Sequence, residues 1–113
     1  QMTPALMRRL LTAHANLFLS LRGLQGNKTR AGKPFPNRIF DTTGRTIKPG
    51  WKQLILDFPD RIMLGADEFI GPGEKAKLAA SFDRTWSIPD TLPGSVREKI
   101  GGENARRVFR LDD

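Results

Sequence analysis

Two short apolar runs, set between segments with helical spacing, constrain most strongly what this chain can fold into. Residues 17–21 (LFLSL) and 61–66 (RIMLGA) are too short for buried helices, and their near-continuous apolarity is typical of strands covered on both faces. Strands that alternate with helices indicate a parallel sheet. Two strands alone do not make an independent sheet. The sequence therefore predicts an α/β fold that is incomplete by itself, with parallel strands near residues 16–21 and 61–66.

The helical segments have recognisable start signals. Thr3 predicts an N-cap, with Pro4 at the first helical position, where its missing N–H costs nothing. This first helix should end near His14. Pro49 opens a second helix, whose apolar stripe consists of Trp51, Leu54, Ile55 and Phe58. Three further helices are expected, at residues 74–82, 96–100 and 105–109, the last two being separated by Gly101-Gly102.

The positive charge is concentrated in one segment. The chain carries 19 Lys and Arg against 12 Asp and Glu, and residues 22–52 hold eight basic residues and one acid, Asp41. Residues 22–48 form a long loop with few apolar anchors, which predicts mobility, with a short hairpin possible at 38–47. Such a loop is either a solvated polar insertion or a phosphate-binding surface. Phe35 and Phe40 offer only two rings for stacking on bases, which favours the insertion.

Composition excludes several kinds of site. The chain of 113 residues has no cysteine, which rules out disulfides, thiolate zinc sites and a cysteine nucleophile. Its single histidine, His14, is too few for a self-contained histidine metal site or a Ser-His-Asp triad. No apolar run reaches the roughly 18 residues of a membrane span, so we expect a cytoplasmic protein with no membrane partner. Because Gln1-Met2 is not a translation start, residues are expected upstream.

Three segments resemble a known family. Residues 58–67 (FPDRIMLGAD) resemble the segment through the last barrel strand of the amidohydrolase-related metal-dependent hydrolases, and residues 103–109 (ENARRVF) resemble their final helix. Residues 10–21 are similar to helix six and strand seven of the same family. The resemblance implies that residues 1–113 are a C-terminal fragment of one (β/α)8 TIM barrel domain, with strands seven and eight and their flanking helices.

The same resemblance implies a function. The family's divalent metal, zinc being the expected ion here, is assisted by an aspartate at the end of strand eight, and Asp67 occupies that position. Other ligands in the family are histidines on earlier strands, so we expect no metal on these residues alone. The complete protein would use metal-activated water on an amide, ester or lactone carbon of a small-molecule substrate, or would be a related decarboxylase. The fragment itself is expected to be inactive.

Strand geometry supports two site residues without the family. Met63, Gly65 and Asp67 share one face of their strand, and a carboxylate at the carboxyl end of a barrel strand is typical of catalysis. The alternative is that Asp67 caps a helix or stabilises a turn. Arg22 shares a face with Phe18 and Ser20, and if that face points inward, Arg22 would lie at the rim of the site, able to bind an anionic substrate group. An exposed arginine at the start of a loop is the alternative.

The remaining conspicuous side chains are interpreted structurally. His14 is expected to interact with the dipole of the first helix at its carboxyl end, Glu68 to lie on the surface, and Asn104 to cap or fix the terminal helix. Trp51 and Trp86 are predicted to be packing residues. Exposed strand edges would favour a homo-oligomer. The alternative function is a small basic module that binds nucleic acid through residues 22–52, which no known nucleic-acid-binding motif supports.

Overall fold

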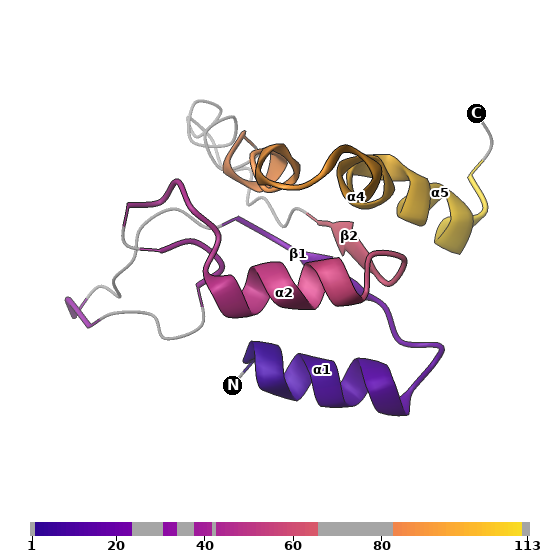
Figure 1. Cartoon of the computed structure of the whole chain (residues 1–113), viewed down its shortest axis with the longest axis horizontal. Coiled ribbons are helices and arrows are strands. Elements are labelled where there is room, and N and C mark those ends of the chain that lie inside the picture. Colours follow the sequence, from indigo (N-terminus) through magenta and orange to yellow (C-terminus); the bar gives the residue numbers. More distant parts are fainter. Residues whose placement is uncertain (1, 24–30, 34–37, 42, 66–82, 112–113) are drawn as a thin grey trace, which may run out of the picture.

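The computed structural model describes residues 2–23, 31–33, 38–41, 43–65 and 83–111. Its first half alternates helices and strands, in the order α1 (Pro4–Ala13), β1 (Leu19–Leu21), α2 (Pro49–Asp57) and β2 (Ile62–Leu64). Its last part is helical, with the 3-10 turn η1 (Pro89–Thr91), α4 (Gly94–Glu98), the π-helical turn η2 (Lys99–Glu103) and α5 (Asn104–Phe109). Figure 1 shows the two strands running between α2 and the α4–α5 segment. The helix expected at 74–82 lies outside the described residues.

Helix α1 begins and ends as predicted. The Thr3 hydroxyl accepts a hydrogen bond from the Leu6 N–H at 3.1 Å, which satisfies one of the backbone donors that a helix start leaves without a partner. Pro4 is the first helical residue and His14 is the C-cap. Met7 and Leu11 are buried, so the side of the helix that carries them is its packed face.

Strands β1 and β2 pair in parallel, as the sequence predicted, with Leu19 opposite Ile62 and Ser20 opposite Met63. Leu19 and Leu21 are buried, whereas Ser20 is exposed. The apolar run of residues 17–21 predicted a strand covered on both faces, and the exposed Ser20 of β1 contradicts this. Within the part of the chain that the structure describes, the helices pack on the face of Leu19 and Leu21.

The hydrophobic core lies on that covered face. Side chains of α1, α2, the η1 region and η2 converge there on the strands, and they form one cluster that includes Met7, Leu11, Leu19, Leu21, Trp51, Leu54, Ile55, Ile62, Ile88, Leu92 and Ile100. Met63 is buried at 7% exposure but does not belong to this cluster, because it points to the opposite face of the sheet with Ser20. The described helices therefore pack on one face of the sheet, and Ser20 and Met63 lie on the other face.

The basic segment is anchored more firmly than its composition suggested. Phe40 and Ile47 form an antiparallel bridge, and the Lys48 N–H donates to the Ile39 carbonyl at 2.8 Å. Gly44 adopts a φ of +71° in the connecting turn, a conformation that glycine adopts without strain. This confirms the hairpin, but Ile39, Phe40 and Ile47 are buried in the core. The expectation of few apolar anchors is thus wrong for this half of the loop.

The terminal segment is one helical rod rather than two helices broken by Gly101-Gly102. Among the described glycines, positive φ occurs at Gly32 and Gly44, so Gly101 and Gly102 keep helical backbone angles. The Asn104 N–H bonds to the Lys99 carbonyl, five residues back, which is the wide π turn. Glycine therefore widens the helix here instead of ending it.

Candidate functional site

The carboxyl ends of β1 and β2 lie at the same edge of the sheet because the strands are parallel. The Gly65 N–H donates to the Leu21 carbonyl at 2.8 Å, so the pairing continues one residue beyond β2. In α/β folds this edge is where ligands bind. Asp67 and Glu68 follow Gly65 along the chain but lie outside the described residues, so the role of Asp67 stays a prediction.

Ser20 and Gly65 meet on the face of the sheet turned away from the helices. A Cβ placed on Gly65 would lie 1.9 Å from the Ser20 Oγ and 3.2 Å from its Cβ, so the serine side chain occupies the space that a larger residue would need. Ser20 is exposed. The exposed face of β1 therefore presents a hydroxyl directly beside the end of β2.

Arg22 follows β1 at this same edge and is half-buried. The next residue, Gly23, is buried, and its N–H donates to the Thr85 hydroxyl at 2.9 Å. A Cβ on Gly23 would lie 2.7 Å from the Arg84 backbone, so the chain leaving β1 is pressed against residues 84–85. This close approach fixes the backbone that carries Arg22.

A second arginine lies near Arg22. Arg38 is half-buried, and burial, followed by the positive charge of Arg22, lowers the pKa of its guanidinium. A third arginine, Arg84, has a structural role. Its Nη1 donates a hydrogen bond to the Gly44 carbonyl at 2.8 Å, and its guanidinium lies 5.8 Å from the centre of the Phe40 ring. The arginines following β1 and preceding the hairpin create a positive field suited to an anionic group.

No metal centre forms within the described part of the chain. His14 is the C-cap of α1, as the sequence indicated, and lies before the amino end of β1 rather than at the edge of Arg22 and Gly65. Across the residues that can be described, no three His, Cys, Asp or Glu side chains come together to hold an ion. No described helix is long and apolar enough to cross a membrane.

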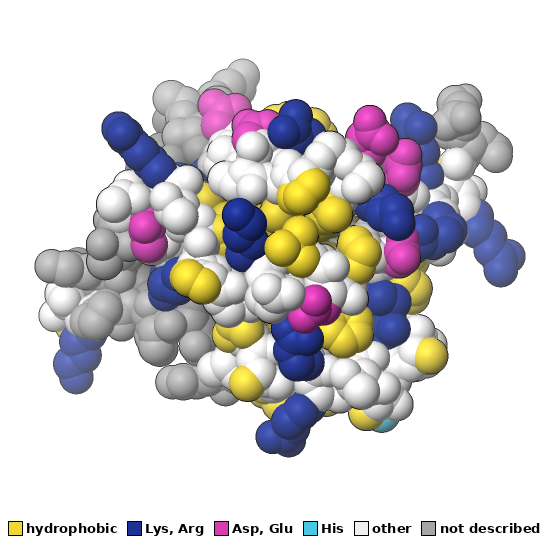
Figure 2. Space-filling view, viewed as in Figure 1, with side chains coloured by type: hydrophobic (Ala, Val, Ile, Leu, Met, Phe, Trp, Pro, Cys, Tyr) yellow, Lys and Arg dark blue, Asp and Glu magenta, His cyan; other side chains and the backbone are white. Residues whose placement is uncertain are grey.

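The described Lys and Arg side chains form no continuous cationic surface on the side of the molecule shown in Figure 2. Lys and Arg side chains are spread there among acidic and apolar ones. Phe40, one of the two rings that could have stacked on bases, is buried at 5% exposure, and Phe35 lies outside the described residues. Phe40 therefore packs in the core and is not exposed for stacking on a base.

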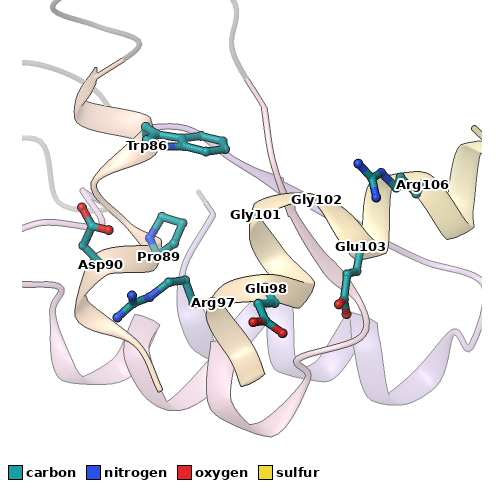
Figure 3. Close-up of a pocket in the computed structure, with 9 residues that line it drawn as sticks. All are labelled: Trp86, Pro89, Asp90, Arg97, Glu98, Gly101, Gly102, Glu103 and Arg106. Atoms are coloured by element: carbon teal, nitrogen blue, oxygen red, sulfur yellow. The ribbon is translucent and has the colours of Figure 1, made fainter. Parts of the chain in front are cut away.

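The structure also describes a surface pocket of about 360 Å³ that the sequence did not suggest. It lies between the residues around η1 and the α4–α5 segment (Figure 3). Trp51 packs in the core as predicted, but Trp86 is 54% exposed and lines this pocket, so its predicted packing role is wrong. The Gly101-Gly102 pair beneath it is the sequence signal that could have indicated an opening.

Parallel strands, helices on one sheet face and polar residues at the carboxyl edge define an α/β protein of the kind that binds ligands at that edge. The chain matches the family model described as amidohydrolase over residues 2–111. It therefore belongs to the amidohydrolase family, which confirms the resemblance seen in residues 10–21, 58–67 and 103–109. The match includes the basic segment. No curated protein and no solved structure matches the chain significantly.

Proposed function

We propose that the chain is the C-terminal portion of a (β/α)8 barrel of a metal-dependent hydrolase, with β1 and β2 as its last two strands. One observation carries this proposal: β1 and β2 are parallel, and their helix-packed core lies on one face. A barrel strand has this arrangement, with helices outside and the interior on the other side. Ser20 and Gly65 would then face the barrel interior.

The proposed reaction is hydrolysis at an amide, ester or lactone carbon, with decarboxylation of an aromatic acid as the related alternative. Asp67 is proposed as the carboxylate that assists a divalent metal, zinc being the expected ion, or that accepts a proton from water. Its support is its sequence position, two residues beyond Gly65 at the carboxyl edge. The described residues do not make up a metal centre, so the proposal assigns only this carboxylate to the chain.

Arg22 is proposed to bind an anionic group of a small-molecule substrate. It follows β1 at the carboxyl edge, and the close contact of Gly23 with the Arg84 backbone holds it in place. Arg38 adds a second positive charge near it. A guanidinium carried on this backbone recognises a carboxylate in preference to a neutral group of the same shape.

The carboxylate role is tested by Asp67→Asn in the complete protein, because this change removes charge and basicity with little change in volume. Turnover should fall on the order of 100-fold or more, with the thermal midpoint preserved and the metal content measured in parallel. Asp90→Asn, an exposed carboxylate on η1, is the matched control and should retain activity. Turnover within a few-fold of wild type in Asp67→Asn would show that Asp67 is only a cap or turn residue.

The substrate-binding role is tested by Arg22→Met, with Arg45→Met as the control from the same basic segment, where Arg45 is exposed. KM for a carboxylate-bearing substrate should rise by about 10-fold or more. KM for its neutral ester or amide analogue should change little. If KM rises equally for the charged and the neutral substrate, Arg22 does not recognise the negative charge, and the proposed substrate-binding role is wrong.

A further inference from the structure

Arg22 lies between two anchored backbone positions at the carboxyl edge of the sheet. Before it, the Leu21 carbonyl accepts a hydrogen bond from the Gly65 N–H at 2.8 Å. After it, the Gly23 N–H donates to the Thr85 hydroxyl at 2.9 Å. The backbone point from which the Arg22 side chain extends is therefore held from both sides, once by β2 and once by Thr85.

The Thr85 hydroxyl bonds to both polar backbone groups of Gly23. It accepts from the Gly23 N–H and donates to the Gly23 carbonyl, with 3.4 Å between the two oxygen atoms. Thr85 is buried at 4% exposure, so water does not readily replace its hydroxyl. A Cβ on Gly23 would lie 2.7 Å from the carbonyl carbon of Arg84. The contact therefore needs a hydroxyl on one segment and a glycine on the other.

The segment that carries Thr85 is itself firmly held. Ile88, three residues further on, is fully buried in the core, and its N–H donates to the Thr85 carbonyl at 3.2 Å. The neighbouring Arg84 donates to the Gly44 carbonyl of the hairpin at 2.8 Å. Two adjacent residues thus join two segments, because Thr85 bonds to the chain leaving β1 and Arg84 bonds to the hairpin that Arg38 begins.

The charge of Arg38 explains why Arg22 needs this support. Burial and then the positive charge of Arg22 lower the pKa of the Arg38 guanidinium, which indicates that the two charges are close. Like charges repel, and this repulsion acts to separate the segments that carry them. Arg84 and Thr85 oppose that separation, so both positive charges are in place before an anion binds, and binding does not have to assemble them.

We propose that Thr85 is a positioning residue for Arg22: its hydroxyl holds the chain leaving β1 where the Arg22 guanidinium binds the anionic group of the substrate. This inference rests on the proposed substrate-binding role of Arg22 and names the residue that maintains it. Thr85 itself does not contact the substrate, because its hydroxyl is engaged by Gly23. Loss of the hydroxyl should therefore act through Arg22 and weaken the binding of an anionic substrate without changing the chemical step.

Thr85→Val tests this role in the complete protein, because valine keeps the shape of threonine and lacks the hydroxyl. KM for a carboxylate-bearing substrate should rise about 3–10-fold, which corresponds to one net hydrogen bond. KM for the neutral ester or amide analogue should change little, and kcat should stay within about two-fold for both. Thr85→Ser retains the hydroxyl and should keep the wild-type KM. Thr91→Val is the matched control, because the Thr91 hydroxyl bonds within its own turn, to the Ile88 carbonyl at 3.0 Å.

Three further measurements separate positioning from a general loss of structure. Thr85→Val added to Arg22→Met should raise KM no further, because Thr85 acts through Arg22. Gly23→Ala forces the same two backbones apart from the other side and should give the same charge-selective rise in KM. In the full chain, the Gly23 amide should exchange its hydrogen about 3–10-fold faster in Thr85→Val than in the wild type or in Thr85→Ser.

The outcomes distinguish this inference from the proposed function. If Arg22→Met affects the charged and the neutral substrate equally, the substrate-binding role of Arg22 is wrong, and the positioning role is overturned with it. If Arg22→Met is charge-selective while Thr85→Val and Gly23→Ala are not, the positioning role alone is overturned. It is also overturned if Thr85→Val still raises KM in the Arg22→Met background, or if the Gly23 amide exchanges at the wild-type rate in Thr85→Val.

Discussion

The two ends of the β1–β2 pair are built differently. At the amino ends, long polar side chains from distant segments donate hydrogen bonds to the backbone: Arg61 reaches back to the end of α1 and Asn104 reaches across to β2. At the carboxyl ends, the described residues include the exposed Ser20 and the half-buried Arg22, and the Thr85 hydroxyl accepts a hydrogen bond from the Gly23 N–H. Among the described residues, the amino ends therefore receive more long-range side-chain hydrogen bonds, and the carboxyl ends present the polar side chains of Ser20 and Arg22. This division of stability and function between the ends of strands is the one that α/β barrels use.

Asn104 makes the main side-chain hydrogen bonds at the amino end of the strand pair. Its Nδ2 donates to the Pro59 carbonyl at 2.6 Å and to the Ile62 carbonyl at 2.8 Å, which ties the first residue of α5 to the start of β2. The side chain is fully buried, and no protein atom in the described structure bonds to its Oδ1. Because water cannot easily replace the amide, these two carbonyls depend on Asn104.

Replacing Asn104 should have the largest effect on stability. Asn104→Leu removes both donated bonds and leaves two carbonyls without a partner in a buried site, which should lower the free energy of unfolding by about 2–4 kcal/mol. Asn16→Leu, the same change at an exposed position, should cost less than about 0.5 kcal/mol. Urea denaturation of the two variants measures the difference. Equal and small losses would mean that the terminal helix is held by apolar packing alone.

Asn104 also shows what the sequence could and could not predict. An asparagine at the start of a short helix is a local signal, and it indicated correctly that Asn104 fixes the helix. The N-cap at Thr3, the helix start at Pro49 and the parallel strands were predicted for the same reason, because helix-start signals and strand periodicity are local. The partners Pro59 and Ile62 are more than 40 residues away, and no local pattern identifies them.

The errors of prediction have one physical cause. Ile39, Phe40 and Ile47 sit in a glycine-rich basic segment, yet they are buried, because the core they join is built by helices elsewhere in the chain. Trp86 is exposed although tryptophan is usually packed. Burial is decided by tertiary neighbours, and a single sequence does not specify them. For the candidate site, the structure places Arg22 at the carboxyl edge, whereas Asp67 remains a prediction from sequence position.

Arg61 also makes hydrogen bonds at the amino end, and its replacement should cause the next largest loss of stability. Its Nε donates to the Leu17 carbonyl at 2.7 Å, and its Nη2 donates to the carbonyls of Leu11, at 3.4 Å, and His14. Arg61→Met should cost about 1–2 kcal/mol, less than Asn104→Leu, because Arg61 is partly exposed and water can replace part of its bonding. Arg61→Lys should not restore stability, since one ammonium cannot span three carbonyls.

Arg9→Met is the control for Arg61→Met, because Arg9 is an exposed arginine on α1, the helix to which Arg61 bonds. Its thermal midpoint and urea midpoint should match the wild type. If Arg61→Lys is as stable as wild type, a single positive charge is sufficient and the geometry of the guanidinium is not what holds α1 to β1.

A smaller effect is expected at the carboxyl end, where Gly65 meets Ser20. Gly65→Ala sets a methyl group against the Ser20 Oγ and 3.2 Å from its Cβ, and should cost about 1 kcal/mol because the exposed serine can rotate. In the Ser20→Ala background the same substitution should cost less, by about 0.5 kcal/mol. A double-mutant cycle in urea measures this coupling. Strict additivity would show that the two residues do not share the space at the end of β2.

The smallest loss of stability is expected from the ion pairs of Asp60, at the amino end of the strand pair. The Lys99 ammonium lies 2.9 Å from its Oδ1 and the Arg107 Nη1 lies 4.0 Å away. The hydrogen bond from Lys99 is the main cause that lowers the pKa of Asp60, with the charges of Lys99 and Arg107 adding to it and burial opposing it. A carboxyl whose pKa is lower in the folded chain stabilises the fold above its unfolded pKa, which is about 3.9 for an aspartate.

That contribution should be present at neutral pH and lost as the pH falls below about 4 through the folded pKa. Asp60 is exposed, so solvent screening keeps its contribution small. Asp60→Asn should therefore lower the thermal midpoint slightly at pH 7 and converge with the wild type near pH 2. Lys99→Met should reproduce most of this pH dependence, because it removes the principal partner. If Asp60→Asn shows the same deficit at both pH values, the contribution of Asp60 is not electrostatic, and the amino end is held by the bonds of Arg61 and Asn104 without help from its ion pairs.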